Sequence, residues 1–304
     1  MTLFDKILDA SIYYSFDLSG FMRHEKKFTN LNTLFSTSLK NKKVLITGGT
    51  SGIGLAAGEF LASMGTKTIV TGRNLEKGKV VSNIENFDFV QLDMVDWKKI
   101  PNFIDQIDCL DFLILNAGGM PEVFSLNEQN VEYQFASQLF GHYFLLSQLY
   151  KNKKLNKNAK VIWVTSGGMY LKSLDIKKVF KDTRYDKVAT YANVKRAQVT
   201  ILDELAKKFH DLKVVAMHPG WVDTPAVREC IPSFYQKMKK RLRSPIQGAD
   251  TILWLLADET VVNSGELYFD RRKVLKHFFW FTKKSDHHAN ELMNLLNQYE
   301  KSFV

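Results

Sequence analysis

The sequence predicts an α/β fold in which helices cover both faces of a doubly wound parallel sheet. Two observations predict it. From residue 42 onward, short runs rich in Val, Ile and Leu alternate with helical segments, a rhythm typical of β-α-β units. The strand runs are apolar throughout, as expected for strands buried on both faces. Because nothing resembling a linker separates residues 42 and 270, we expect one domain over residues 41–270.

The expected elements follow one another in a regular order. A strand at 42–47 leads through a glycine-rich turn into a helix at 55–65, which Gly65 ends. Pro101 interrupts the first turns of a helix expected at 96–107. The other strands are expected at 66–72, 87–93, 110–118, 159–168, 212–220 and 265–269, and the other helices at 128–151, 186–209 and 244–258.

Two flanking segments lie outside this rhythm. Residues 271–304 are expected to form a C-terminal helical tail, with Ser285 or Asp286 as its N-cap. Residues 1–40 form an N-terminal extension. We expect it to pack on the main domain, with a position on a membrane surface as the alternative. Its apolar residues fall at helical spacing: Leu3, Phe4, Ile7, Leu8 and Ile12.

The charge balance is basic, with 42 Lys and Arg against 32 Asp and Glu, for a net charge of +10. This excess suits an anionic ligand or an acidic surface. The basic clusters at 151–160 and 236–243 lack the interleaved aromatic residues of a nucleic-acid reader. We therefore expect a small-molecule partner, no nucleic acid, and peripheral membrane contact as an alternative.

The two cysteines, Cys109 and Cys230, are too few for a disulfide framework and lie in no cluster with metal-ligand spacing. We expect no metal site and a reducing, cytoplasmic location. Charged residues at 5, 6, 9 and 17 interrupt any secretory apolar run. The apolar run HFFWF at 277–281 is far too short to span a membrane.

The segment LITGGTSGIGLA, residues 45–56, forms the first strand-to-helix turn. Gly48 lets the chain turn tightly as it leaves the strand, and Gly52 and Gly54 let the backbone approach a pyrophosphate. The free N–H groups at the start of the helix suit phosphate oxygens. A glycine pattern placed between a strand and a helix predicts a Rossmann-type dinucleotide site, with a purely structural tight turn as the alternative.

The second strand ends with Arg73, where a site selective for NAD carries an acidic residue. An arginine can hold a 2′-phosphate in a bidentate, charge-assisted pair, so we expect NADP rather than NAD. Alternatively, Arg73 stacks on adenine or is solvated. Asp93 and Asn116 end the third and fourth strands, and ligands of such sheets lie beyond the carboxyl ends of the strands. Both are therefore candidate cofactor contacts.

The chemical centre is expected where Ser166 ends the fifth strand and Tyr191 and Lys195 follow on the next helix. Residues four apart share a helix face. A free tyrosine has a pKa near 10, and a neighbouring lysine ammonium favours the phenolate and lowers that pKa. With Ser166 holding a carbonyl, Tyr191 could protonate the alkoxide formed when a nicotinamide gives hydride.

These motifs, TGGTSGIG, NAG, the serine on the fifth strand and YANVK, resemble the classical short-chain dehydrogenase/reductase family over residues 42–270. Segments 19–28, 165–170 and 217–256 resemble one branch of it more closely. The resemblance implies that Ser166 orients the substrate, Tyr191 is the acid/base, and Lys195 tunes Tyr191 and binds ribose. It also implies the following cofactor contacts: Thr47, Gly48, Thr50, Ser51, Gly52, Ile53, Gly54, Arg73, Asp93, Asn116, Ala117, Gly118, Tyr191, Lys195, Pro219, Gly220 and Thr224.

Gln138 departs from the family pattern, which has an asparagine at this position linking the lysine to solvent through water. Glutamine carries the same donors and acceptors, but its extra methylene moves them. We expect Gln138 to belong to the catalytic set with reduced or retuned activity. The alternative is a weak or inactive nucleotide-binding scaffold or sensor.

The substrate side is expected to be formed by the long segment 167–190 and by a lid at 227–243. Four apolar residues are candidates for lining the substrate pocket, and they suggest a lipophilic carbonyl or alcohol as substrate. The alternative is that these residues belong to the core. His218 is expected to be structural. The resemblance places a homodimer contact on the helices at 128–151 and 186–209, unless the N-terminal extension covers that face. The apolar candidates are Met169, Tyr170, Trp221 and Phe234.

Overall fold

The computed structural model describes residues 8–9, 11–35, 39–182, 184–257 and 262–302. Its centre is one eight-stranded sheet in the order β3-β2-β1-β4-β5-β6-β7-β8. The strands are β1 (Lys43–Thr47), β2 (Lys67–Gly72), β3 (Phe87–Gln91), β4 (Leu110–Leu115), β5 (Leu155–Val164), β6 (Lys213–Met217), β7 (Leu267–Phe269) and β8 (Arg272–Val274).

The first seven strands are parallel, and only β8 runs antiparallel, against β7. The predicted α/β class and the doubly wound parallel sheet are confirmed. The order reverses at β1, which lies between β2 and β4. The carboxyl end of β1 is therefore the switch point where a ligand crevice is expected. The sequence did not predict β8, whose three residues extend the sheet beyond residue 270.

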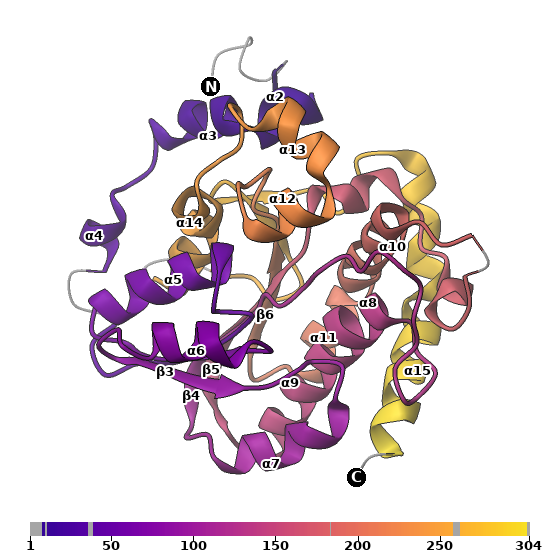
Figure 1. Cartoon of the computed structure of the whole chain (residues 1–304), viewed down its shortest axis with the longest axis horizontal. Helices are drawn as coiled ribbons and strands as arrows, with labels where there is room; N and C mark the ends of the chain where they lie inside the picture. The colour runs from indigo at the N-terminus through magenta and orange to yellow at the C-terminus, as the bar shows by residue number, and fades with distance from the viewer. Residues whose placement is uncertain (1–7, 10, 36–38, 183, 258–261, 303–304) are drawn as a thin grey trace.

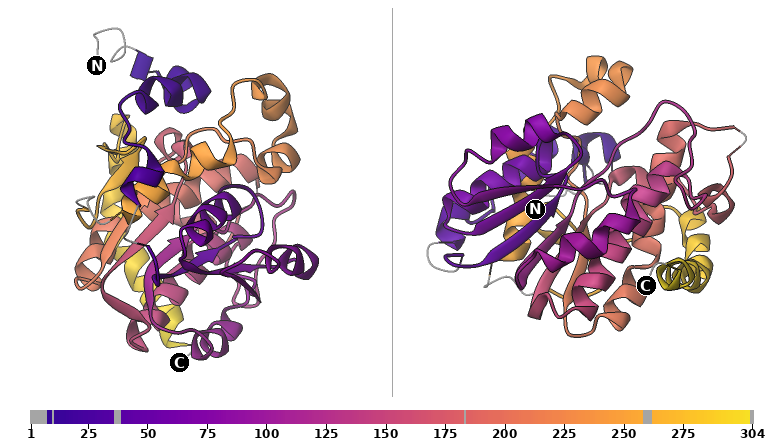
Figure 2. Two further views of the ribbon diagram at one scale, coloured as in Figure 1. Left: turned by 90° about the vertical axis from the view of Figure 1, so that its left-hand side faces the viewer. Right: turned by 60° about the horizontal axis from the view of Figure 1, so that its bottom comes forward.

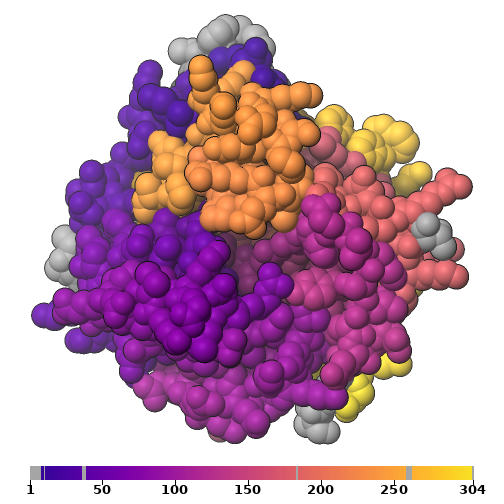
Figure 3. Space-filling view, viewed as in Figure 1, coloured from indigo at the N-terminus to yellow at the C-terminus, as the bar shows by residue number. Residues whose placement is uncertain are grey.

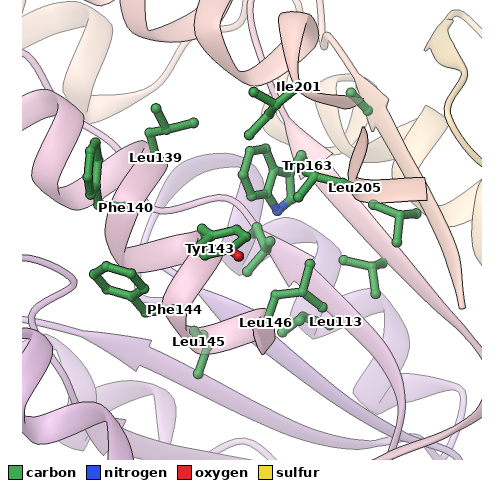
Figure 4. Close-up of a cluster of buried hydrophobic side chains, with 14 of the residues drawn as sticks. Leu113, Leu139, Phe140, Tyr143, Phe144, Leu145, Leu146, Trp163, Ile201 and Leu205 are labelled. Carbon is green, nitrogen blue, oxygen red and sulfur yellow. The ribbon is translucent and has the colours of Figure 1, made fainter. Parts of the chain in front are cut away.

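Helices cover both faces of the sheet (Figure 1). Side chains of β1 alternate between two cores: Leu45 faces one, and Val44 and Ile46 face the other. Helices α5 and α14 close the second core, and α7, α9, α10, α11 and α15 close the first. Figure 4 shows part of the first core, where Tyr143 and Leu146 of α9 lie near Trp163 of β5.

The helices of this layered structure are α2 (Ile12–Phe16), α3 (Leu18–Glu25), α4 (Leu31–Leu34), α5 (Gly52–Ser63), α6 (Leu75–Val81), α7 (Ile100–Asp105), α8 (Tyr133–Phe135), α9 (His142–Lys151), α10 (Lys187–Thr200), α11 (Leu202–Lys208), α12 (Pro225–Cys230), α13 (Pro232–Met238), α14 (Pro245–Leu256) and α15 (Ala289–Lys301). Short 3-10 turns are η1 (Trp97–Lys99), η3 (Gly167–Leu171), η4 (Ile176–Val179) and η5 (Trp280–His288), and η2 (Ala136–Gly141) is a π-helix.

Three helix boundaries differ from the expected ones. The helix expected from residue 128 begins at Tyr133 and passes through the π-turn η2 before α9. The segment 186–209 divides into α10 and α11. The C-terminal α-helix begins at Ala289, not next to Ser285 or Asp286, because η5 occupies those residues. The Ser285 hydroxyl instead accepts a hydrogen bond from Leu174 N at 2.9 Å.

The described part of the N-terminal extension packs against the main domain, with α2 and α3 near α13 and α4 beside α14 (Figures 1 and 2). Phe16 is 4% exposed and contacts the rings of His218, Trp221 and Phe269. Ile12 also packs on the first core. Of the other apolar residues expected on this helix, Leu3, Phe4 and Ile7 lie outside the described residues.

A buried ion pair fastens this extension to the end of the sheet. Arg243 and Asp270 are 1% and 3% exposed, and their side chains are joined by two hydrogen bonds of 2.5 and 3.0 Å. The same guanidinium donates to the carbonyl oxygens of Ser15 and Phe16. Such a charge needs several partners when it is removed from water. The backbone of the extension supplies them here.

Within the described ranges, no helix is long and apolar enough to cross a membrane.

Candidate active site

The glycine-rich turn adopts the backbone conformation that glycine permits. Gly48 and Gly52 have φ angles of +67° and +57°, which side chains disfavour. A Cβ added to Gly48 would lie 2.8 Å from Ala117 Cα, and one on Gly54 would lie 2.5 Å from Gly48 O. The turn therefore packs closely against the residues that follow β4, and α5 begins at the carboxyl end of β1, the switch point of the sheet.

Thr47 and Asn116 brace this turn across the crevice. The Thr47 hydroxyl accepts hydrogen bonds from Asn116 N and Ala117 N at 2.9 and 3.0 Å. The Asn116 amide donates to the carbonyl oxygens of Thr47 and Gly48 at 3.1 Å each. Ser51, the N-cap of α5, makes no side-chain capping bond. The first N–H groups of α5 can therefore serve an anion.

These features fit a nicotinamide dinucleotide. The positive-φ glycines keep side chains away from the start of α5, where a pyrophosphate would bind the backbone. Thr50 lies over the end of β2, since a Cβ on Gly72 would be 3.0 Å from its side chain. Thr224 stands opposite, 3.2 Å from a Cβ placed on Gly52. Two small side chains, Thr50 and Thr224, therefore flank the glycine-rich turn.

Arg73 follows β2 directly and is exposed. Its Nη1 donates to the Tyr133 hydroxyl at 2.5 Å. Burial raises the pKa of Tyr133, Asp93 raises it further, and Arg73 lowers it. Asp93 accepts from Val95 N at 3.1 Å. Arg73, Asp93 and Tyr133 therefore lie together, although the sequence did not single out Tyr133.

Ser166, Tyr191 and Lys195 come together at the carboxyl end of β5. Ser166 caps η3 by accepting from Gly168 N at 3.3 Å, and its side chain lies close enough to Tyr191 to lower the pKa of that phenol. Asp186 caps α10 through Ala189 N at 2.7 Å, which fixes the start of the helix carrying Tyr191 and Lys195. The Lys195 Nζ lies 5.3 Å from the centroid of the Tyr191 ring.

Burial is the main cause of the pKa shifts at this pair. It raises the pKa of Tyr191 to about 12, and Ser166 opposes this shift in part. Lys195 lies over the ring and donates to Val164 O at 3.0 Å. It is 2% exposed, and burial lowers its own pKa to about 7. Burial is therefore the largest cause of both pKa shifts.

Gln138 lies in the π-turn η2 and supports the loop after β4. Its amide Nε2 donates to Gly119 O at 2.9 Å. Its Oε1 is buried and has no hydrogen-bond partner among the described residues. Its backbone oxygen accepts from His142 Nδ1 and from Gln198 Nε2, at 3.1 and 2.8 Å. Both lone pairs of that carbonyl are thus used.

His142 links this π-turn to the glycine-rich turn, a role that its position inside a helix did not reveal. Its Nε2 lies 2.9 Å from the Thr47 hydroxyl, opposite the bond to Gln138 O. Burial, and next the charge of Lys195, lower the pKa of His142 to about 3. The neutral ring therefore donates from Nδ1 and accepts at Nε2.

The apolar residues expected on the substrate side divide into two kinds. Met169 and Tyr170 are buried in the first core. Trp221 is partly buried and contacts Tyr13 and Phe234, with ring centroids 5.7 and 5.4 Å apart. Figure 3 shows a hollow where the orange segment that contains α12 and α13 meets the purple and magenta parts of the chain.

Pro219 and Gly220, expected beside the nicotinamide, are held by the N-terminal extension and Arg243. Pro219 O accepts from Arg243 Nη1 at 3.3 Å. Gly220 has φ +76°, and a Cβ there would lie 2.6 Å from Phe16 O and from the Arg243 guanidinium. His218 is buried and stacks on Phe269 at 4.1 Å. That contact agrees with the structural role expected for His218.

The family model for short chain dehydrogenase matches residues 42–233. The chain belongs to the short-chain dehydrogenase family. It is an NAD(P)-dependent oxidoreductase of this type. It is 33% identical over 273 residues to human "Dehydrogenase/reductase SDR family member 12", covering 85% of this chain and 86% of that protein. This is the branch that segments 19–28, 165–170 and 217–256 resemble, so that recognition is confirmed.

The chain is also similar to a more distant relative and to a solved structure. It is 28% identical over 258 residues to human "Retinol dehydrogenase 12", covering 79% of this chain and 81% of that protein. It shares its fold with the solved structure of BdcA in complex with NADPH, with a TM-score of 0.62, 20% identity, and coverage of 76% and 93% of the two chains.

Proposed function

We propose that the chain interconverts a carbonyl and a hydroxyl group, with Tyr191 as the acid/base. The observation that carries this proposal is the convergence of Ser166, Tyr191 and Lys195 at the carboxyl end of β5. Bound NADPH would supply the hydride. Ser166 orients the carbonyl oxygen, and the Tyr191 hydroxyl gives its proton to that oxygen as negative charge develops on it.

A pair of tyrosine variants tests this role. Replacing Tyr191 by Phe removes the hydroxyl and keeps the ring over which Lys195 lies. We expect turnover of a carbonyl panel to fall by about 100-fold or more, while NADPH binding, followed by fluorescence titration, changes little. The matched control is Tyr235→Phe, on α13. Equal turnover in the Tyr191→Phe variant would refute the assignment.

We propose NADP as the preferred cofactor. Its support is Arg73 at the end of β2, where the chain has no acidic residue to repel a 2′-phosphate. A hydrogen bond to a charged group is worth about 1.5–3 kcal/mol. Arg73→Ala should therefore weaken NADPH binding by roughly 10- to 150-fold and leave NADH binding unchanged. An unaltered ratio of the two affinities would exclude the 2′-phosphate role.

We further propose a lipophilic substrate. The support is the group of rings beside the site, where Trp221 contacts Tyr13, Phe16 and Phe234. The name of the similar retinol dehydrogenase agrees with such a substrate. Aliphatic aldehydes and ketones of increasing chain length should show a rising kcat/KM, because each buried methylene adds about 0.8 kcal/mol.

A second candidate function, a weakly active scaffold or sensor, is favoured by Gln138. The carbonyl oxygen of Gln138 is already used by His142 and Gln198. A water chain from Lys195 through that oxygen would have to displace one of them. Nucleotide binding without turnover across the same carbonyl panel would support this candidate.

The helices on which a homodimer contact is expected are covered by another part of the same chain. The covering segment is the C-terminal helix α15, not the N-terminal extension. Helix α15 lies along α9, α10 and α11 (Figures 1 and 2). Leu292 and Leu296 are buried in the first core, and Asn297 Oδ1 accepts from Tyr143 and Lys208. A homodimer and a cytoplasmic location stay predictions. Light scattering coupled to gel filtration would test the first of them.

A further inference from the structure

Large apolar side chains project from the segment that follows β8 and includes the first residues of η5, here called the aromatic loop (residues 275–281). Leu275 and Trp280 are 72% and 74% exposed, and Phe278 and Phe279 are 44% and 38% exposed. Phe278, Phe279 and Trp280 are consecutive. An exposed apolar cluster of this kind marks an interaction surface. The loop lies in the yellow part of the chain beside α10 in Figure 1.

The backbone of the aromatic loop is held by buried groups. Tyr170 donates its hydroxyl proton to Leu275 O at 2.7 Å. Arg196, which is fully buried, donates from Nη2 to Lys276 O and to Met169 O, at 2.9 and 3.0 Å. A third bond joins the Ser173 hydroxyl to Phe281 O at 2.6 Å. The exposed rings are therefore presented by a rigid support.

Basic residues predominate in the segment that contains the aromatic loop, although His277 of the loop pairs with the carboxylate of Asp286 at 3.1 Å. Residues 271–285 include six Lys and Arg and no Asp or Glu. Four of the six are already paired with carboxylates from elsewhere in the chain. Lys283 and Lys284 are exposed, and neither has an ion pair within the described part of the chain. Lys284 Nζ lies 5.5 Å from the centroid of the Trp280 ring. Two ammonium groups without a carboxylate partner among the described residues therefore lie close to the exposed aromatic rings in the chain.

We propose that the aromatic loop attaches the protein to the surface of a bilayer that contains anionic lipids. Tryptophan and phenylalanine enter the boundary between headgroups and acyl chains, and neighbouring lysines bind lipid phosphates. The exposed Lys283 and Lys284, together with the chain's net charge of +10, favour such a surface over a second copy of this basic chain. This attachment goes beyond the proposed reaction and does not depend on it.

The aromatic loop is also continuous with the wall of the candidate active site. The Tyr170 ring contacts Phe278 on one side and Phe16 and His218 on others, at 5.4, 6.3 and 5.9 Å. Tyr170 belongs to η3, which Ser166 caps. Attachment here would therefore hold the catalytic end of the sheet near the membrane, from which a lipophilic compound can enter.

Vesicle co-sedimentation of the full-length protein tests the proposal. The vesicles contain phosphatidylcholine with or without phosphatidylserine. The first variant, Phe279→Ser with Trp280→Ser, should reduce partitioning onto phosphatidylserine vesicles at least about tenfold, because both rings leave the interface. The matched control, Val80→Ser with Val123→Ser, removes side chains that are 68% and 71% exposed elsewhere and should partition as the parent does.

The second variant, Lys283→Glu with Lys284→Glu, tests the charge. It should lose binding to phosphatidylserine vesicles by about fivefold or more for each lysine, and binding should fall as salt rises. Absence of vesicle binding by the parent, or equal losses in the valine control, would overturn the proposal. It would also be overturned if the serine variant changed the oligomeric state of the protein but not its vesicle binding.

Discussion

Replacing Lys195 by Met should make the protein more stable while abolishing turnover. Lys195 is 2% exposed, and among the described residues its ammonium has one hydrogen-bond acceptor, Val164 O, and no carboxylate partner. Burial lowers its pKa from 10.5 to about 7, which corresponds to a penalty of about 5 kcal/mol on the charged form. Met keeps most of the volume and removes the charge.

The size of the gain depends on pH. Below pH 7 the folded and unfolded chains both carry the proton, so the whole penalty acts on the folded state. From 7 to 10.5 the unfolded chain holds more protons, and the parent gains stability as pH rises. Leaving Val164 O without its donor costs about 1–3 kcal/mol. Lys195→Met should therefore be stabilised by about 2–4 kcal/mol below neutrality, and that advantage should vanish at high pH.

Urea unfolding at about pH 6 and about pH 10 measures the difference between variant and parent. Lys177→Met, which changes an exposed lysine, is the control and should differ from the parent by less than about 0.5 kcal/mol at either pH. If the difference in free energy of unfolding between Lys195→Met and the parent does not change with pH, burial does not lower the pKa of Lys195. A stabilised but inactive variant would mark Lys195 as a residue kept for chemistry at a cost in stability.

Three further variants test other parts of the structure. Burial raises the pKa of Glu132 to about 7 from 4.5, so stability falls as pH rises through this window. In Glu132→Gln, the free energy of unfolding should no longer fall by about 3 kcal/mol across this pH range, as measured by urea unfolding. An unchanged slope would contradict it. Asp270→Asn leaves the buried Arg243 without its counter-charge and should cost about 3–5 kcal/mol. Trypsin should then cut sooner within residues 11–25, whereas parent-like cleavage would refute this anchoring. Gln138→Asn should raise kcat if the glutamine limits proton transfer, and an equal kcat would assign Gln138 to bracing the loop at Gly119.

The features predicted well from the sequence are local ones. The alternation of apolar strands and helices determines a parallel sheet, because strands buried on both faces need helices above and below. Gly48, Gly52 and Gly54 determine the phosphate turn, because their positions next to a strand and a helix leave few alternatives. Ser166, Tyr191 and Lys195 could be grouped because parallel strands bring their carboxyl ends to one edge.

The features that the sequence did not reveal depend on long-range contacts. His142 looks like an ordinary helix residue, and only folding brings it against Thr47. The same holds for Tyr133 beside Arg73. Strand β8 is too short to show a periodicity of its own, and it forms because β7 offers an edge to pair with.

The sequence by itself predicted the family, the sheet and the candidate reacting side chains, because each prediction rests on residues close together in the chain or at strand ends. Only the tertiary structure decided what surrounds them. It placed Phe16 and Arg243 over the end of the sheet and α15 over the expected dimer face. It also buried Lys195, and this burial lowers the pKa of its ammonium group. The burial of a side chain depends on every segment that packs around it, so it cannot be predicted from a local sequence pattern.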